Sequence, residues 1–97
     1  MLFRSNVNLN DILYVEGLKD YIKIHLTGKT ILTLNSLKKL QEILPESRFV
    51  RVHRSFIVSL PKIDSIQRNR IVIGKAFVPV GENYKNAFKN IISSINL

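Results

Sequence analysis

An alternating run of apolar and polar residues, Phe49–Val58, dominates the middle of the chain. A period of two along this run is typical of a half-buried β-strand. The apolar positions that share one face are Val50, Val52, Phe56 and Val58. Arg54 falls on the same face, where an unpaired guanidinium would be costly to bury. We therefore predict two strands, Phe49–Val52 and Ser55–Ser59, joined by a tight turn at His53-Arg54.

The first third of the chain has the pattern of a three-strand meander followed by a helix. The predicted strands are Asp11–Glu16, Tyr21–Leu26 and Thr30–Leu34, separated by turn residues that include Gly17 and Gly28. Before them, the alternation around Val7 and Leu9 is consistent with an edge strand. A short helix starts near Asn35 or Ser36, which supply a capping oxygen, and ends at Pro45. Its apolar face comprises Leu37, Leu40, Ile43 and Leu44.

The last third predicts three short strands and a C-terminal amphipathic helix. The strands are Ile63–Gln67, Ile71–Ile73 and Ala76–Val80, with a basic turn at Arg68-Asn69-Arg70. The helix spans Glu82–Ile95 and places Tyr84, Phe88, Ile91, Ile92 and Ile95 on one face. Strands this short, with frequent turns, indicate a mainly β meander or sandwich and not an α/β fold.

Composition narrows the class of protein. With 97 residues, the chain 1–97 is one domain, and 45% hydrophobic residues exclude disorder. A net charge of +8 and a pI of about 10.1 favour an anionic partner, first nucleic acid and next an anionic membrane surface. Lysine kept only for solubility is the alternative. No apolar run is long enough to span a membrane, and the lack of Cys fits a reducing compartment, so we expect a cytoplasmic protein.

Catalytic chemistry is poorly supported. The seven carboxylates are scattered singly, without the paired spacing of an acid and a base. His53 and Ser55 lack an orienting carboxylate nearby, and two His without Cys make a poor zinc site. No glycine-rich phosphate loop occurs. We expect no enzyme activity, catalytic residue, metal or cofactor.

Binding chemistry is better supported, because basic side chains crowd the central hairpin. Arg48, Arg51, His53 and Arg54 offer donors and positive charge suited to phosphates and guanine edges. The structural alternatives are surface salt bridges from Arg48 or Arg51 to Glu46 or Asp64, worth at most about 1 kcal/mol, and a partly buried His53. Similarly, the outward stripe Tyr21-Lys23-His25 is either a contact surface or an ordinary solvated strand face.

The central run R-F-V-R-V-H-R-S-F-I-V closely resembles the signature of LytTR domains, the mainly β DNA-binding modules of many bacterial response regulators. The segments N-D-I-L-Y-V-E-G, D-Y-I-K-I-H-L, S-L-K-K-L-Q-E-I-L-P and P-V-G-E-N-Y-K follow the same family order and spacing, from about Asn8 onward. The resemblance implies an elongated stack of small antiparallel sheets with one short helix and a C-terminal amphipathic helix. It also implies a truncated N-terminal strand and an upstream receiver domain absent from this chain.

Relatives of this kind present loops, and no recognition helix, to successive major grooves. By position, the three loops correspond to Lys19-Asp20-Tyr21, His53-Arg54-Ser55 and Gly81-Glu82-Asn83. Two of them depart from the family pattern, because Asp20 and Glu82 are acidic where relatives often carry a donor. Either Asn83 and Lys85 take over in the third loop, Glu82 reads a cytosine amine, or that contact is lost. Phosphate or supporting contacts are expected from Lys19, Tyr21, Arg51, His53, Ser55, Asn83 and Lys85.

The resemblance and the residues together predict sequence-specific binding of double-stranded DNA, as the output domain of a two-component transcriptional regulator. Arg54 is the first candidate for base readout. Two copies on adjacent DNA sites are expected by family analogy, because one module reads few base pairs. The alternative is a small basic β module that binds RNA or another polyanion, although paired exposed aromatics for stacking are lacking.

Overall fold

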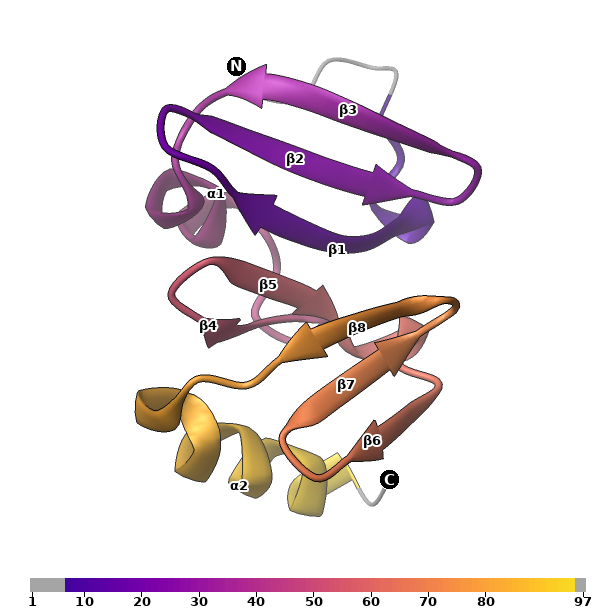
Figure 1. The fold of residues 1–97 in the computed structure, drawn as a ribbon, viewed down its shortest axis with the longest axis vertical. Helices are drawn as coiled ribbons and strands as arrows, with labels where there is room; N and C mark the ends of the chain where they lie inside the picture. The colour runs from indigo at the N-terminus through magenta and orange to yellow at the C-terminus, as the bar shows by residue number, and fades with distance from the viewer. Residues whose placement is uncertain (1–6, 96–97) are drawn as a thin grey trace.

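The structure, a computed structural model, describes residues 7–95 and contains two antiparallel sheets and two α-helices (Figure 1). The larger sheet has the order β3-β2-β1-β5-β4 and the smaller the order β6-β7-β8. The strands of the larger sheet are β1 (Ile12–Gly17), β2 (Tyr21–Leu26), β3 (Lys29–Leu34), β4 (Phe49–His53) and β5 (Phe56–Ser59). The smaller sheet consists of β6 (Ser65–Gln67), β7 (Arg70–Ile73) and β8 (Ala76–Pro79). The helices are α1 (Leu37–Ile43) and α2 (Lys85–Ile95), and the 3-10 turns are η1 (Leu9–Asp11), η2 (Leu60–Lys62) and η3 (Glu82–Tyr84).

One core lies between the larger sheet and α1. The apolar face of α1 covers the sheet, and Leu40 is fully buried there. The helix begins where the Ser36 hydroxyl accepts a hydrogen bond from the Lys39 backbone N–H (3.2 Å), as the sequence predicts. The buried residues of this core are Ile12, Val15, Ile22, Ile24, Leu26, Leu37, Leu40, Leu44, Phe49 and Ile57.

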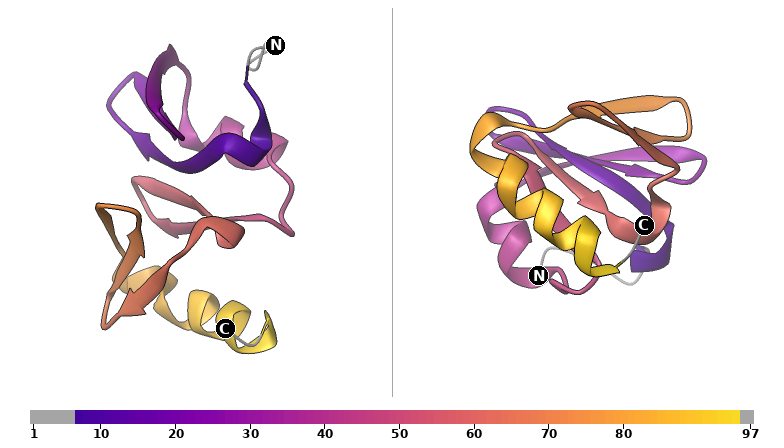
Figure 2. Two further views of the ribbon diagram at one scale, coloured as in Figure 1. Left: turned by 90° about the vertical axis from the view of Figure 1, so that its right-hand side faces the viewer. Right: turned by 90° about the horizontal axis from the view of Figure 1, so that it is seen from below.

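A second core joins the other side of the β4–β5 hairpin to the smaller sheet and α2. Figure 2 shows the resulting stack, with the hairpin between the upper strands and the smaller sheet with α2. The buried residues of this core are Val52, Val58, Leu60, Ile71, Ile73, Val78, Val80 and Phe88. The hairpin therefore contributes side chains to both cores. The predicted fold class, a mainly β stack of small antiparallel sheets with two helices, is confirmed.

The central hairpin differs from its prediction by one residue. β4 extends through His53, and the turn consists of Arg54 and Ser55, so that His53 pairs with Phe56. The reason is an irregularity between Arg51 and His53, where the strand carries one extra residue opposite β5. A period of two cannot reveal such a bulge. Its effect is to place both Arg54 and Ser55 in the turn.

Three other boundaries were also wrong. In the described part of the expected edge strand, Val7 and Asn8 precede the 3-10 turn η1, which includes Leu9 and Asn10. The Asn8 side chain accepts a hydrogen bond from the Asn10 N–H (2.9 Å), and Met1–Asn6 lie outside the described residues. β6 starts only at Ser65, because Ile63 still caps η2 through its N–H, which donates to the Leu60 carbonyl (3.2 Å). The C-terminal helix starts as the separate turn η3, and α2 follows. On α1, Ile43 is 55% exposed, because Leu44, past the helix end, fills the buried position instead.

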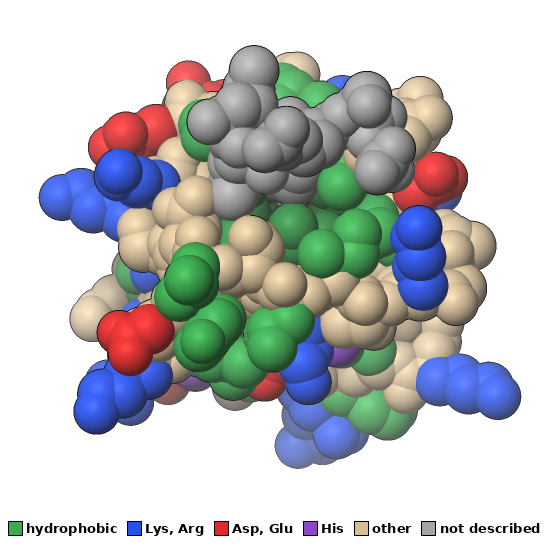
Figure 3. All heavy atoms as spheres, turned by 90° about the horizontal axis from the view of Figure 1, so that it is seen from above, with side chains coloured by type: hydrophobic (Ala, Val, Ile, Leu, Met, Phe, Trp, Pro, Cys, Tyr) green, Lys and Arg blue, Asp and Glu red, His purple; other side chains and the backbone are tan. Residues whose placement is uncertain are grey.

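The β3 edge presents apolar side chains to solvent. Ile31 and Thr33 face inward, while Leu32 and Leu34 are 56% and 68% exposed. Figure 3, which looks onto this end of the molecule, shows hydrophobic side chains at the surface between charged ones.

We expect Leu40→Ala to lower the free energy of unfolding by about 2–5 kcal/mol, because it removes a fully buried side chain and leaves a cavity under the sheet. The matched control Leu34→Ala removes the same atoms from an exposed position and should change stability by about 0.5 kcal/mol or less. Urea unfolding followed by circular dichroism measures both. Equal midpoints for the two variants would contradict the assigned core.

Candidate nucleic-acid interface

The tip of the β4–β5 hairpin projects a single free cation. Arg54 is exposed, and among residues 7–95 its guanidinium has neither an ion-pair nor a hydrogen-bond partner. Its backbone carbonyl, in contrast, is engaged by a neighbouring side chain. Arg54, the residue expected from the sequence to contact a base, therefore has an unpaired guanidinium and a fixed backbone.

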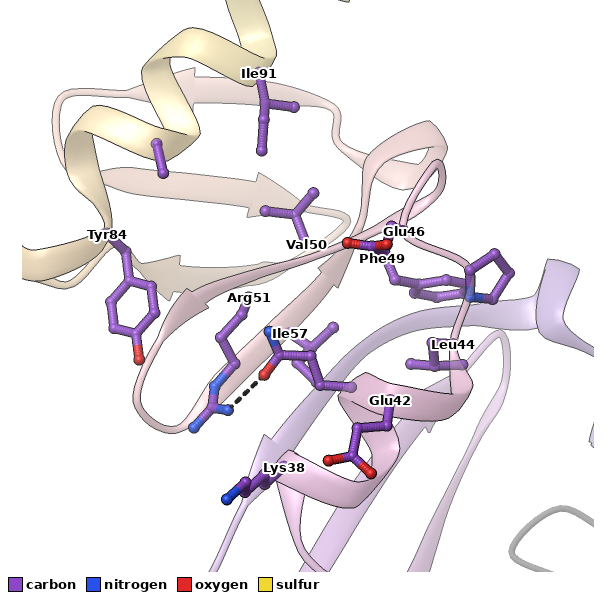
Figure 4. Close-up of a pocket in the computed structure, with 13 residues that line it drawn as sticks. Lys38, Glu42, Leu44, Glu46, Phe49, Val50, Arg51, Ile57, Tyr84 and Ile91 are labelled. Atoms are coloured by element: carbon purple, nitrogen blue, oxygen red, sulfur yellow. Dashed lines mark hydrogen bonds between the residues drawn. The ribbon is translucent and has the colours of Figure 1, made fainter.

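Arg51 provides that fixation. Its Nε donates to the His53 carbonyl (3.0 Å) and its Nη2 to the Arg54 carbonyl (2.6 Å). Its Nη1 donates to Oε1 of Gln41 on α1 (2.9 Å), a bond drawn in Figure 4. One guanidinium thus joins the end of β4, the turn and α1. Its planar array of donors is suited to holding several acceptors in a fixed geometry.

His53 supports the turn from its other side. Its Nδ1 accepts a hydrogen bond from the Ser55 backbone N–H (3.0 Å), so the ring proton of the neutral side chain lies on Nε2. The ring also packs edge-on against Phe56, with centroids 5.5 Å apart. His53 is half-buried, and of its ring nitrogens Nε2 is the one left for an external partner.

The β1–β2 turn, which carries the first predicted loop, is attached to the hairpin through its backbone. Gly17 N–H donates to the Ser55 carbonyl (2.7 Å), and Leu18 N–H donates to the Tyr21 carbonyl (2.8 Å) to close the turn. Lys19 and Asp20 follow as exposed residues. Gly17 is needed for close approach, because a Cβ there would lie 2.7 Å from Leu37 Cδ1.

The third predicted loop lies against the opposite side of the hairpin. Gly81 N–H donates to the Val52 carbonyl (2.8 Å), and a Cβ on Gly81 would lie 3.4 Å from His53 Cδ2. Glu82 and Asn83 are exposed in η3. Lys85 at the start of α2 forms an ion pair with Glu82, so the acidic residue neutralises the nearest cation.

The three predicted loops therefore meet at one side of the molecule. In Figure 1 the β1–β2 turn, the β4–β5 turn and η3 lie one below another along the left-hand side, parallel to the long axis. That axis measures 33 Å. The hairpin is the middle loop, and backbone hydrogen bonds join it directly to both neighbours.

Arg48 and Asp64, which were considered as partners in surface salt bridges, both have other hydrogen-bond partners. Neither predicted salt bridge from Arg48 or Arg51 occurs among residues 7–95, since Arg48 donates to the Asn10 side chain. The Asp64 carboxylate accepts from the Gly74 N–H (2.6 Å).

The Tyr21-Lys23-His25 stripe faces outward from β2, as predicted, but its last residue, His25, already contacts other side chains. The His25 ring stacks on Tyr14 at 4.1 Å and its Nε2 lies 3.3 Å from Glu16. Burial raises the pKa of the Tyr14 hydroxyl above its ordinary value, and the Glu16 carboxylate raises it further. Of this stripe, only Tyr21, 43% exposed, adjoins the first loop.

Three supporting residues were not identified from the sequence. Gln41 anchors Arg51, yet its position on a polar helix face gives no sign that α1 meets the hairpin. Gly17 and Gly81 were recognised only as turn or loop residues, although each permits a close contact. Among the described residues no group of three or more His, Cys, Asp or Glu is placed to hold a metal. None of the described helices has the length and apolar character needed to cross a membrane.

The chain is similar in sequence to bacterial regulatory proteins. The chain is 33% identical to the sensory transduction protein LytT of Bacillus anthracis over 92 residues, covering 89% of this chain and 37% of that protein. It is 30% identical to an uncharacterized response regulatory protein of Vibrio cholerae, covering 86% of this chain and 35% of that protein. The chain thus spans little more than a third of these relatives.

A solved LytTr DNA-binding domain from Bacillus cereus has the same fold, with a TM-score of 0.81 and 24% identity over 94% of this chain and 93% of that one. The sequence model of the LytTr DNA-binding domain family matches residues 4–93, nearly the whole chain. Domains of this family are a non-enzymatic kind. The chain belongs to the LytTR DNA-binding domain family.

Proposed function

We propose that this domain binds double-stranded DNA in a sequence-specific manner through its three aligned loops, as the output domain of a two-component regulator. The observation that supports this most is the state of Arg54. Its guanidinium is unpaired among the described residues, while the backbone beneath it is held by Arg51. An unpaired guanidinium on a fixed backbone is suited to a bidentate contact with guanine O6 and N7 in the major groove.

The size of the domain supports binding along one side of the duplex. The longest axis of the molecule, along which the three loops are arranged, measures 33 Å, and one turn of B-DNA rises about 34–36 Å. Two copies of the domain on adjacent sites would extend the sequence read beyond what one module can distinguish.

The acidic residues set the roles of the outer loops. Asp20 and Glu82 are exposed, and their negative charges repel phosphate. These two residues therefore do not contribute to affinity for the DNA backbone. A carboxylate can accept from a cytosine amine instead. In the third loop we assign base contact to Glu82 or Asn83 and phosphate contact to Lys85, which must exchange its partner Glu82 for the DNA.

RNA or another polyanion is the alternative partner. Stacking of single-stranded bases requires neighbouring exposed aromatics, and near these loops the described residues offer Tyr21 alone. Comparison of duplex DNA, single-stranded DNA and anionic vesicles at matched salt distinguishes these partners. The proposal requires the duplex to bind most tightly.

Arg54→Ala should weaken binding to a preferred duplex, identified by selection from random sequences, by about 1–3 kcal/mol and relax the preference at one base pair. Arg54→Lys keeps the positive charge but loses the two parallel N–H donors of the guanidinium. It should therefore retain affinity for scrambled duplexes but no longer discriminate between them and the preferred duplex. Fluorescence anisotropy measures each affinity. Equal losses on preferred and scrambled duplexes for Arg54→Ala would refute base readout by this residue.

Arg51→Met should release the turn, since it removes three hydrogen bonds worth about 0.5–1.5 kcal/mol each. We expect roughly tenfold faster hydrogen exchange at the Gly17 amide, which donates to the Ser55 carbonyl, and a loss of selectivity between preferred and scrambled duplexes.

The control for this variant is Arg48→Met, because Arg48 also lies in the hairpin segment but donates only to Asn10. Exchange at the Ile24 amide in the first core monitors global stability in both variants. If Arg51→Met weakened all duplexes equally and left Gly17 exchange unchanged, Arg51 would be a phosphate contact and not a positioning residue.

Glu82→Gln should tighten binding to every duplex, because it removes a negative charge and frees Lys85. Lys85→Ala should flatten the plot of log affinity against log salt by about one unit, and the flattening should be larger in the Glu82→Gln background. An unchanged salt slope in both backgrounds would remove Lys85 from the phosphate contacts.

A further inference from the structure

A basic cleft adjoins the third loop, outside the three loops discussed so far. It has a volume of about 460 Å³ and lies between the β6–β7 turn and α2. Its floor is apolar and includes Phe88 and Ile92, while no carboxylate lines it. The polar lining residues are Arg68, Asn69, Lys85, Asn86, Lys89 and Ser93. Three cations together with amide and hydroxyl donors make a surface complementary to an anion with several acceptor oxygens.

The β6–β7 turn is held beside the loops by the backbone. Val80 N–H donates to the Asn69 carbonyl (2.9 Å), one residue before Gly81 bonds to the hairpin. Arg68 has a φ of 47°, a left-handed conformation that is uncommon for residues other than glycine and asparagine. The turn thus keeps a long cationic side chain at a position where a small residue would be the easier choice.

We propose that this cleft binds backbone phosphates of the DNA duplex, beyond the base pairs contacted by the third loop. This inference rests on the proposed function and adds a fourth contact to it. Arg68 supplies two parallel donors for the phosphate oxygens, and Lys89 supplies a point charge. Lys85, one helical turn before Lys89 on α2, is shared with the third loop and joins them once it exchanges its partner Glu82.

The position of the cleft fits this partner better than an isolated small anion. In Figure 1 the β6–β7 turn and the start of α2 lie at the lower end of the molecule, next to η3. A duplex running along the aligned loops would continue past this end. Its next phosphates would then meet Arg68 and Lys89, whereas bases would be out of reach, so the contact adds affinity without sequence preference.

The test uses the double variant Arg68→Gln/Lys89→Gln and the control Lys38→Gln/Lys39→Gln, which removes the same charge from exposed positions on α1. Affinity for the preferred duplex is measured from about 50 to 200 mM salt. In the plot of log affinity against log salt, the slope of the cleft variant should be smaller by about two units. Between 50 and 200 mM salt its affinity should therefore fall by a factor roughly ten times smaller than that of the unsubstituted domain. Its discrimination between preferred and scrambled duplexes should be unchanged, and the control should keep more of the slope.

A second arm locates the contact on the DNA. The preferred duplex is prepared with neutral methylphosphonate linkages at one end or the other. Neutral linkages at the end beside the third loop should weaken the unsubstituted protein and leave the cleft variant unaffected. Salt slopes equal to those of the α1 control, or equal sensitivity of both proteins to the neutral linkages, would overturn the assignment.

A third arm separates this inference from the proposed function. Vesicles with and without phosphatidylglycerol are titrated with the same proteins. If the unsubstituted domain bound vesicles and not duplex DNA, the proposed function itself would fail. If duplex binding stayed specific while the cleft variant lost only vesicle binding, the cleft would be a headgroup site and the DNA assignment would be overturned.

Discussion

The hydrogen bonds of the Arg51 guanidinium are the interaction on which the proposed DNA-reading surface depends. Here the carbonyls of His53 and Arg54 are both occupied by one rigid donor group, which is itself held by Gln41 on α1. The backbone that carries the unpaired Arg54 side chain therefore needs little further ordering when a partner binds. Such preorganisation reduces the entropic cost of binding.

The hairpin can play this central role because it belongs to both cores. Ile57 and Phe49 are buried against α1, while Val52 and Val58 are buried toward the smaller sheet. The first and third loops then bond to the hairpin backbone from opposite sides. Three segments distant in the sequence are placed in line by one two-stranded unit. Both α-helices pack against the sheets, while the three aligned loops consist of two β-turns and η3.

Much of the fold could be predicted from the sequence, because its periodicities are strong. Alternation along Tyr21–Leu26 and the capping oxygen of Ser36 identified β2 and the start of α1 almost to the residue. The hairpin turn was displaced by one position, since a β-bulge adds a residue without altering the apolar pattern. The bond between Gln41 and Arg51 was beyond prediction, because it depends on how α1 docks and not on local spacing. The ion pair of Glu82 with Lys85 could have been predicted from their i, i+3 spacing.

The most direct measurement of the central claim is an amide chemical-shift titration of the domain with a preferred duplex. The account predicts the largest changes at Arg54 and Ser55, with further changes at Lys19-Asp20 and Glu82-Asn83, and small changes on β3 and on the exposed face of α1. Changes concentrated on β3 or α1, with the hairpin tip unaffected, would contradict it.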